Sequence, residues 1–110
     1  MAAETFPALT TEVAQRIAAL LGAPLREAPF SAGGAPVYEL TVRSAVLRAD
    51  VTLLLWTGLA RADIRLGDST MVFKQVDAVE LYPGVEVLFR RREPPGYLFL
   101  SVGGRASMVL

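Results

Sequence analysis

The spacing of apolar residues changes once along this chain, and the change limits the folds that the chain can adopt. In the first 22 residues, apolar side chains recur at steps of three and four, which is the period of an amphipathic helix. They are Phe6, Leu9, Val13, Ile17, Leu20 and Leu21. From Val37 onward the period is two, as in strands that bury one face. The sequence therefore predicts one helix followed by a series of strands.

Capping residues place the predicted helix at about residues 5–22. Thr5 can cap its first turn, and Thr10 or Thr11 is the alternative cap if the helix begins later. Gly22, followed two residues later by a proline, is a stop signal. Because the helix is amphipathic, we expect its apolar side to lie on another apolar surface.

The rest of the chain is divided between a predicted loop and predicted strands. Residues 23–36 contain three prolines and a Gly-Gly pair without a regular spacing of apolar residues, so they are predicted to form a loop. Antiparallel strands are predicted over residues 37–110, in the segments 37–43, 47–55, 60–66, 70–81, 85–91, 97–102 and 105–110. The segment 70–81 is expected to be bent or bulged, and residues 50–59 have a short buried helix as their alternative.

The predicted fold class is α+β, in a single domain that spans residues 1–110. Its N-terminal amphipathic helix packs on a curved antiparallel meander sheet of about six or seven strands, with a partly closed barrel as the alternative. The apolar fraction of 53% is sufficient for a core of this size without disulfides.

The last predicted hairpin is apolar on both faces. With Gly103-Gly104 as a two-residue turn, the cross-strand pairs are Ser101 with Ala106, Phe99 with Met108 and Tyr97 with Leu110 on one face, and Leu100 with Ser107 and Leu98 with Val109 on the other. A sheet with one wet face would alternate apolar and polar residues, so we expect a cover on both sides or a contact with another chain. The last strand also lacks the charge, proline or bulge that protects an edge. The predicted interface residues are Tyr97, Leu98, Phe99, Leu100, Met108, Val109 and Leu110.

Histidine and cysteine are both absent from the 110 residues. Their absence excludes Ser-His-Asp and Cys-His catalysis, zinc bound by histidine or cysteine, and thiol redox chemistry within one chain. The remaining candidates are carboxylates and Lys74, the only lysine, and neither the spacing of the acidic residues nor an S-x-x-K pattern supports a site. The sequence therefore predicts no catalytic residue, no metal ligand and no cofactor.

The only run of like charge is Arg90-Arg91-Arg92, close to the aromatic residues of the last hairpin. Arginines beside aromatic rings can bind anions, so this run is the candidate anion contact. Strand alternation sends Arg91 to the face opposite Arg90 and Arg92, and a two-residue turn at the preceding Pro-Gly pair would place Asp77 opposite Arg90 as a charge pair. The net charge is zero, so the chain as a whole does not attract nucleic acid.

The favoured function is a non-catalytic interaction or assembly module that binds a second copy or another protein through its C-terminal hairpin. One alternative is a carrier of a small apolar ligand, with a pocket between helix and sheet lined by residues such as Leu53, Leu55, Ile64, Val87 and Phe99. The other is an enzyme that uses only carboxylate, arginine, tyrosine or lysine groups. The longest apolar stretch, residues 51–60, is far shorter than the about 20 residues of a membrane span, so a cytoplasmic location without a membrane partner is predicted.

Overall fold

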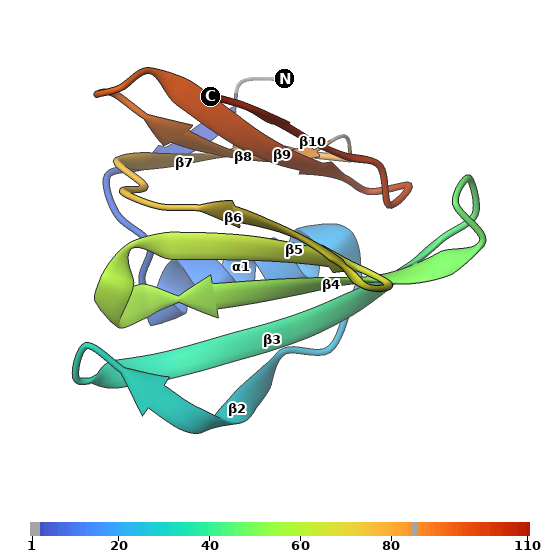
Figure 1. The fold of residues 1–110 in the computed structure, drawn as a ribbon, viewed down its shortest axis with the longest axis horizontal. Helices are drawn as coiled ribbons and strands as arrows, with labels where there is room; N and C mark the ends of the chain where they lie inside the picture. The colour runs from blue at the N-terminus through green and yellow to red at the C-terminus, as the bar shows by residue number, and fades with distance from the viewer. Residues whose placement is uncertain (1–2, 85) are drawn as a thin grey trace.

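The computed structural model describes residues 3–84 and 86–110. This part of the chain contains one α-helix, a 3-10 turn (η1) and ten strands, arranged as two antiparallel sheets of five strands each (Figure 1). Sheet I has the strand order β2-β3-β4-β5-β6, and sheet II has the order β1-β7-β8-β9-β10. The elements are β1 Glu4–Phe6, α1 Thr11–Leu21, β2 Arg26–Ala32, β3 Ala35–Ser44, β4 Ala49–Trp56, η1 Thr57–Leu59, β5 Arg61–Leu66, β6 Ser69–Phe73, β7 Ala78–Tyr82, β8 Glu86–Arg91, β9 Gly96–Ser101 and β10 Ala106–Val109.

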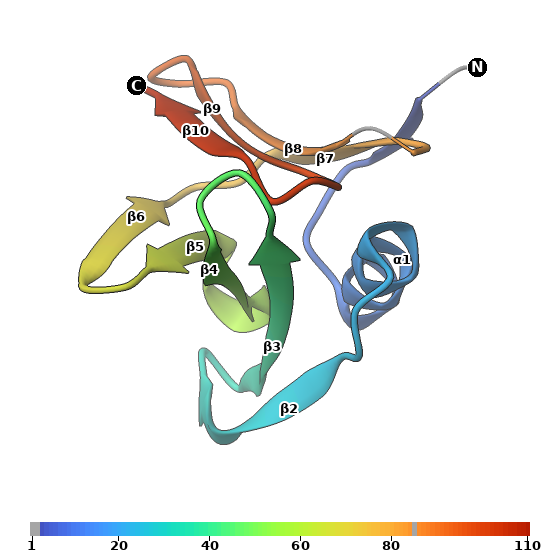
Figure 2. The ribbon, with the colours of Figure 1, turned by 90° about the vertical axis from the view of Figure 1, so that its right-hand side faces the viewer.

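The two sheets face each other across one core. Figure 2 shows α1 along one side of this sandwich, where it contacts β3 of sheet I and β7 of sheet II. Side chains from neighbouring strands of each sheet fill the core and are at most 1% exposed: Leu40, Leu53 and Ile64 from sheet I, and Val79, Phe89 and Leu98 from sheet II. The helix adds Val13, Ile17 and Leu21 to the same core. The described residues form no helix that is long and apolar enough to span a membrane.

The helix begins later than predicted. Phe6 fits the helical spacing but lies in β1, where the backbone pairs with β7. Because this pairing gives the segment strand hydrogen bonds, the helix starts only at Thr11. The alternative cap Thr10 accepts a hydrogen bond on its hydroxyl from the N–H of the third helical residue at 3.3 Å. The helix stops as predicted at Gly22, which adopts a left-handed φ of 65°.

The prediction of a loop over residues 23–36 is wrong, because this region contains β2 and the turn into β3. β2 is an edge strand, and Pro29 falls where its pairing with β3 shifts register, a place where a residue without an N–H is tolerated. Gly33 and Gly34, with φ of 63° and 74°, form the two-residue turn. A Cβ at Gly33 would lie 2.4 Å from the carbonyl oxygen of Gly58 in η1, so these two turns also need glycine to approach each other.

The predicted single strand over residues 70–81 is two strands in different sheets. Residues 74–77 carry the chain from β6 in sheet I to β7 in sheet II, with Gln75 at a left-handed φ of 59°. The fold is therefore a sandwich of ten strands, not one meander of six or seven, and it does not close into a barrel because each sheet ends in two edge strands. In the segment 50–59, β4 takes up most of the residues and only Thr57–Leu59 form a helical turn.

The last hairpin has a longer turn than predicted. The N–H of Ser101 donates to the carbonyl oxygen of Arg105 at 2.8 Å, so three residues, not two, lie between these partners. Gly104 has a left-handed φ of 84°, as expected for the last residue of a three-residue turn. The extra residue shifts the pairing by one, so that Phe99 lies opposite Ser107 and not opposite Met108.

The register between β7 and β8 also differs by one residue from the predicted one. Tyr82 pairs with Glu86, whereas a two-residue turn at the Pro-Gly pair requires the pairing of Tyr82 with residue 85, which lies outside the described residues. Arg90 consequently lies opposite Ala78, and the predicted charge pair between Arg90 and Asp77 is wrong. Arg90 forms its ion pair with a different residue of β7, described below.

Candidate interaction surface

The outer face of sheet II has an apolar centre at Leu88. Its neighbours along β8, Val87 and Phe89, are fully buried in the core, so alternation points Leu88 outward. Leu88 is nevertheless only 7% exposed. Glu80 of β7 and Phe99 of β9 flank it across the sheet, and side chains of this outer face shield it from water.

Two aromatic rings from β9 extend this apolar centre toward the sheet edge. Tyr97 and Phe99 are two residues apart and share the outer face, with ring centroids 6.4 Å apart and planes inclined by 28°. Tyr97 is paired with Val109 of β10, which is 45% exposed. Together with Leu88, these side chains form an outer apolar strip that crosses β8, β9 and β10.

A polar network lies on the other side of Leu88. The hydroxyl of Tyr82 donates to Glu80 Oε1 at 2.6 Å, and the guanidinium of Arg90 forms an ion pair with Glu80 Oε2. The Tyr82 hydrogen bond, followed by the contact with Arg90, lowers the pKa of Glu80 below its ordinary value against the opposing effect of burial. The same contacts raise the pKa of Tyr82 and of Arg90, so all three groups keep their usual neutral-pH charge states. None of the three groups of the network therefore gains or loses a proton near neutral pH.

The strip and the network together line a hollow of about 260 Å³. Its lining residues are Tyr82, Glu86, Leu88, Arg90, Tyr97 and Phe99. The sequence reasoning identified both β9 aromatics but missed Tyr82, Glu86 and Leu88. The signal was present in the apolar run from residue 87 to 89, which does not alternate and therefore indicates a strand that is apolar on both faces.

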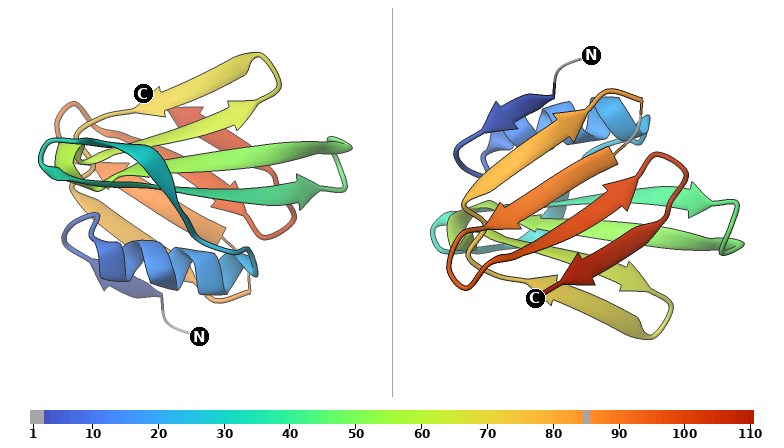
Figure 3. Two further views of the ribbon diagram at one scale, coloured as in Figure 1. Left: turned by 90° about the horizontal axis from the view of Figure 1, so that it is seen from below. Right: turned by 90° about the horizontal axis from the view of Figure 1, so that it is seen from above.

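β10 is an edge strand with unused backbone groups. The bond from Ser101 N–H to the Arg105 oxygen begins an antiparallel ladder in which bonded and non-bonded pairs alternate. The backbone groups of Ser107 therefore point toward β9, and those of Ala106 and Met108 point away from the sheet. β10 itself, Ala106–Val109, carries no charged side chain. Figure 3 shows that β10 and the sheet I edge β6 both lie on the side of the sandwich away from α1.

The predicted interface residues separate onto two faces. Leu98 and Leu100 are fully buried in the core, and Met108 is partly buried against it. The residues on the outer face are Tyr97, Phe99 and Val109. Leu110, which follows β10, is 71% exposed. The structure thus brings together three of the seven predicted residues on one outer surface, with Leu110 beside the open edge.

The three arginines of the run make three different sets of contacts. Arg90 is held by Glu80, as described above. The Nε of Arg91 donates to the carbonyl oxygen of Pro94 at 2.7 Å, and its guanidinium lies 4.8 Å from the ring centroid of Phe73. The backbone N–H of Arg92 donates to Asp77 Oδ2 at 2.7 Å. All three arginines line one hollow of about 310 Å³, together with Asp77, Ala78 and Pro95, and two of their guanidinium groups already have partners within the fold. The anion contact stays a prediction.

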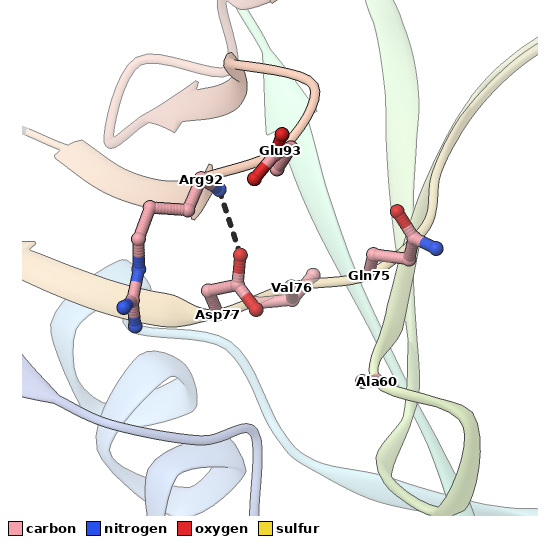
Figure 4. A pocket seen from close by; sticks show the side chains of 6 residues that line it. All are labelled: Ala60, Gln75, Val76, Asp77, Arg92 and Glu93. Carbon is pink, nitrogen blue, oxygen red and sulfur yellow. Dashed lines mark hydrogen bonds between the residues drawn. The ribbon is translucent and has the colours of Figure 1, made fainter.

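A larger and more open hollow of about 580 Å³ lies where the chain crosses between the sheets (Figure 4). Its lining residues are Ala60, Gln75, Val76, Asp77, Arg92 and Glu93. Asp77 is used by the backbone of the β8–β9 turn, and only Glu93 brings a second carboxylate. No group of three or more histidine, cysteine, aspartate or glutamate side chains that could hold a metal ion occurs among the described residues.

The residues suggested for a carrier pocket lie on both sides of sheet II or within the core. Leu53, Leu55, Ile64 and Val87 are each 0% exposed and contact other core side chains. Phe99 belongs to the outer strip.

A scan against protein-family models, a search of curated proteins and a search of solved structures each found no match for this chain.

Proposed function

We propose that this protein is a non-catalytic assembly module that pairs with a second copy of itself through β10. The observation that carries the proposal is an uncharged edge strand with free backbone groups next to an apolar outer face. An exposed edge of this kind is a template for another strand, and natural proteins usually block it with charge, proline or a bulge. A cytoplasmic location remains a prediction, which cell fractionation would test.

The other edges are less suited to this role. β1 has only three residues, and its Glu4 is tied to Arg16 of the helix at 2.8 Å. β2 contains Pro29 and a register shift, two features that protect an edge. β6 is uncharged like β10, but its outer-face neighbours on β5 include Arg65 and not aromatic rings. Among the edge strands of the described residues, β10 alone is crossed by the outer apolar strip.

The outward backbone groups define a register for the pairing. A two-fold axis at Met108 would place the Met108 residues of the two copies opposite each other, and Ala106 opposite the second copy's Leu110. All three strand positions have outward N–H and C=O groups if the strand continues to Leu110, so this register forms about six backbone hydrogen bonds. It repeats no like charge across the axis, and it covers Leu110, the most exposed large apolar side chain among those described.

The oligomeric state of a matched set of variants tests the proposal. Val109→Lys adds an outward charge to the proposed edge and should convert a dimer into a monomer in light scattering or sedimentation. Leu59→Lys is the matched control, because Leu59 is also 45% exposed but lies at η1, and it should leave the dimer intact. A monomeric parent at high concentration, or a dimer broken by Thr70→Lys in β6 and not by Val109→Lys, would contradict the proposal.

Disulfide trapping tests the register, since the natural chain has no cysteine to interfere. The proposed axis places Ser107 opposite the second copy's Val109, in a non-bonded pair with Cα atoms about 4.5 Å apart. A mixture of Ser107→Cys and Val109→Cys proteins should form the mixed disulfide on mild oxidation, detectable by mass spectrometry. Each variant alone should cross-link poorly, because the two copies of one residue are more than about 7 Å apart. The reverse pattern would mean a different register.

A further inference from the structure

The hollow on the outer face of sheet II is lined by one more negative charge than the basic residues around it neutralise. Arg90 is the only basic residue that lines it, and Glu80 neutralises this arginine. Glu86 lies at the end of the hollow near Tyr82 and has no ion-pair partner among the described residues. The anion contact predicted at Arg90, Arg91 and Arg92 concerns a different hollow, and in this one the arrangement of charges favours a cation.

The remaining lining is suited to a cationic side chain with an apolar stem. Tyr82, Tyr97 and Phe99 provide rings whose electron-rich faces attract ammonium and guanidinium groups. Leu88 forms an apolar floor on which the methylene groups of lysine or arginine can lie. Glu86 provides the acceptor for a charge-assisted hydrogen bond.

The molecule uses the same combination of groups twice within its own fold. The guanidinium of Arg61 lies 4.7 Å from the Trp56 ring centroid and forms an ion pair with Asp63 at 2.8 Å. A second set occurs at the N-terminal side, where Arg16 lies 5.7 Å from the Phe6 ring centroid and 2.8 Å from Glu4. Each set consists of an arginine, an aromatic ring and a carboxylate.

We infer that the hollow lined by Tyr82, Glu86, Leu88, Arg90, Tyr97 and Phe99 binds an arginine or lysine side chain of a partner protein. Like the sets described above it has aromatic rings and a carboxylate, and its own arginine, Arg90, is already paired with Glu80, which leaves Glu86 for a second cation. This inference goes beyond self-association, because the hollow is built on β7, β8 and β9 and is present whether or not β10 pairs with a second copy.

Titration with a matched pair of small probes tests the inference. N-acetyl-arginine methylamide should shift backbone amide NMR signals of β7, β8 and β9, and added salt should weaken the effect. N-acetyl-citrulline methylamide has nearly the same shape without the charge and should bind more weakly by roughly fivefold. Equal binding of the two probes, preferred binding of an N-acetyl-glutamate analogue, or no shifts up to the solubility limit of the arginine probe would overturn the inference.

Variants of the full chain locate the site. Glu86→Gln keeps the shape of the side chain and should weaken binding of the arginine probe by roughly fivefold. Glu39→Gln is the matched control, because Glu39 is also a half-buried strand residue but lies in sheet I, and it should leave binding unchanged. Phe99→Leu removes a ring while keeping an apolar side chain and should also weaken binding. Unchanged binding in both Glu86→Gln and Phe99→Leu would contradict the assignment.

Discussion

The outer faces of the two sheets differ in how their side chains are paired. On sheet I the polar groups pair with one another: Thr41 with Thr52 at 3.2 Å, Arg43 with Asp50 at 3.6 Å, and Arg61 with Asp63 at 2.8 Å. A small second core of Ala28, Val37 and Leu54 lies on the same side of that sheet. On sheet II the corresponding surface has the network of Glu80 with Tyr82 and Arg90, beside an apolar strip that runs from the nearly buried Leu88 to Val109, which is 45% exposed. We call the outer surface of sheet I the closed face, because its polar side chains pair within the chain, and that of sheet II the open face, where we propose that a partner binds.

The difference arises from cross-strand pairs and not from the alternation within each strand. Arg43 lies directly opposite Asp50, so these two charges of sheet I meet across the ladder. On sheet II, Leu88 lies opposite Phe99, and Tyr97 opposite Val109, so apolar side chains meet one another. The register of the strands therefore decides whether polar side chains on a face pair with one another or apolar side chains gather there. A shift of the register by one residue would change every one of these pairs.

The largest change in the free energy of unfolding is expected from removing the buried carboxylate of the closed face. Asp63 is only 3% exposed and accepts hydrogen bonds from Arg61 and from the indole N–H of Trp56. Asp63→Ala removes both and should lower the free energy of unfolding by about 2–3 kcal/mol, measured by urea denaturation followed by circular dichroism. Asp63→Asn keeps an acceptor for Trp56 and should cost less. A loss below about 1 kcal/mol in the alanine variant would show that sheet I does not depend on this cluster.

A smaller, pH-dependent effect is expected from the single polar network of the open face. Its contacts lower the folded-state pKa of Glu80, so their contribution is fully present above the ordinary value of 4.5 and is lost as the pH falls through the folded value. Glu80→Gln should therefore cost about 1 kcal/mol at neutral pH and have less effect as the pH falls below 4.5, measured by urea denaturation across this range. A cost that stays constant down to acidic pH would contradict the proposed role of the charge.

Most strand positions could be predicted from alternation, but the length of the last turn and the sheet switch could not. The Gly-Gly pair at residues 33–34 forms a two-residue turn, whereas the pair at 103–104 belongs to a three-residue turn with only Gly104 at positive φ. The two identical dipeptides also differ in what they contact: Gly33 approaches Gly58 of the same sheet, and Gly104 approaches Ser44 of the other sheet. A Cβ at Gly104 would lie 2.6 Å from the Cβ of Ser44, which is 0% exposed at the end of β3. That contact joins the two sheets and has no local signature in the sequence.

The sheet switch was missed for a related reason. Residues 74–77 contain neither glycine nor proline, and the left-handed φ occurs at Gln75. Without a turn signal, the apolar residues on both sides appear to belong to one strand. The candidate surface was predicted in part, since the β9 aromatics follow from alternation, whereas Tyr82 and Glu86 join them only through the pairing of β7, β8 and β9.

The smallest effect is expected at the exposed part of the closed face. The hydroxyls of Thr41 and Thr52 are 3.2 Å apart on a solvent-exposed part of sheet I. Thr41→Val keeps the β-branched shape and removes only this hydrogen bond, which competes with water, so the free energy of unfolding should change by no more than about 0.5 kcal/mol. Urea denaturation of this variant and of Asp63→Ala shows whether the exposed polar pairs or the buried carboxylate contribute more to the stability of sheet I. A loss of about 2 kcal/mol in Thr41→Val would mean that its exposed pairs, and not its buried carboxylate, hold sheet I together.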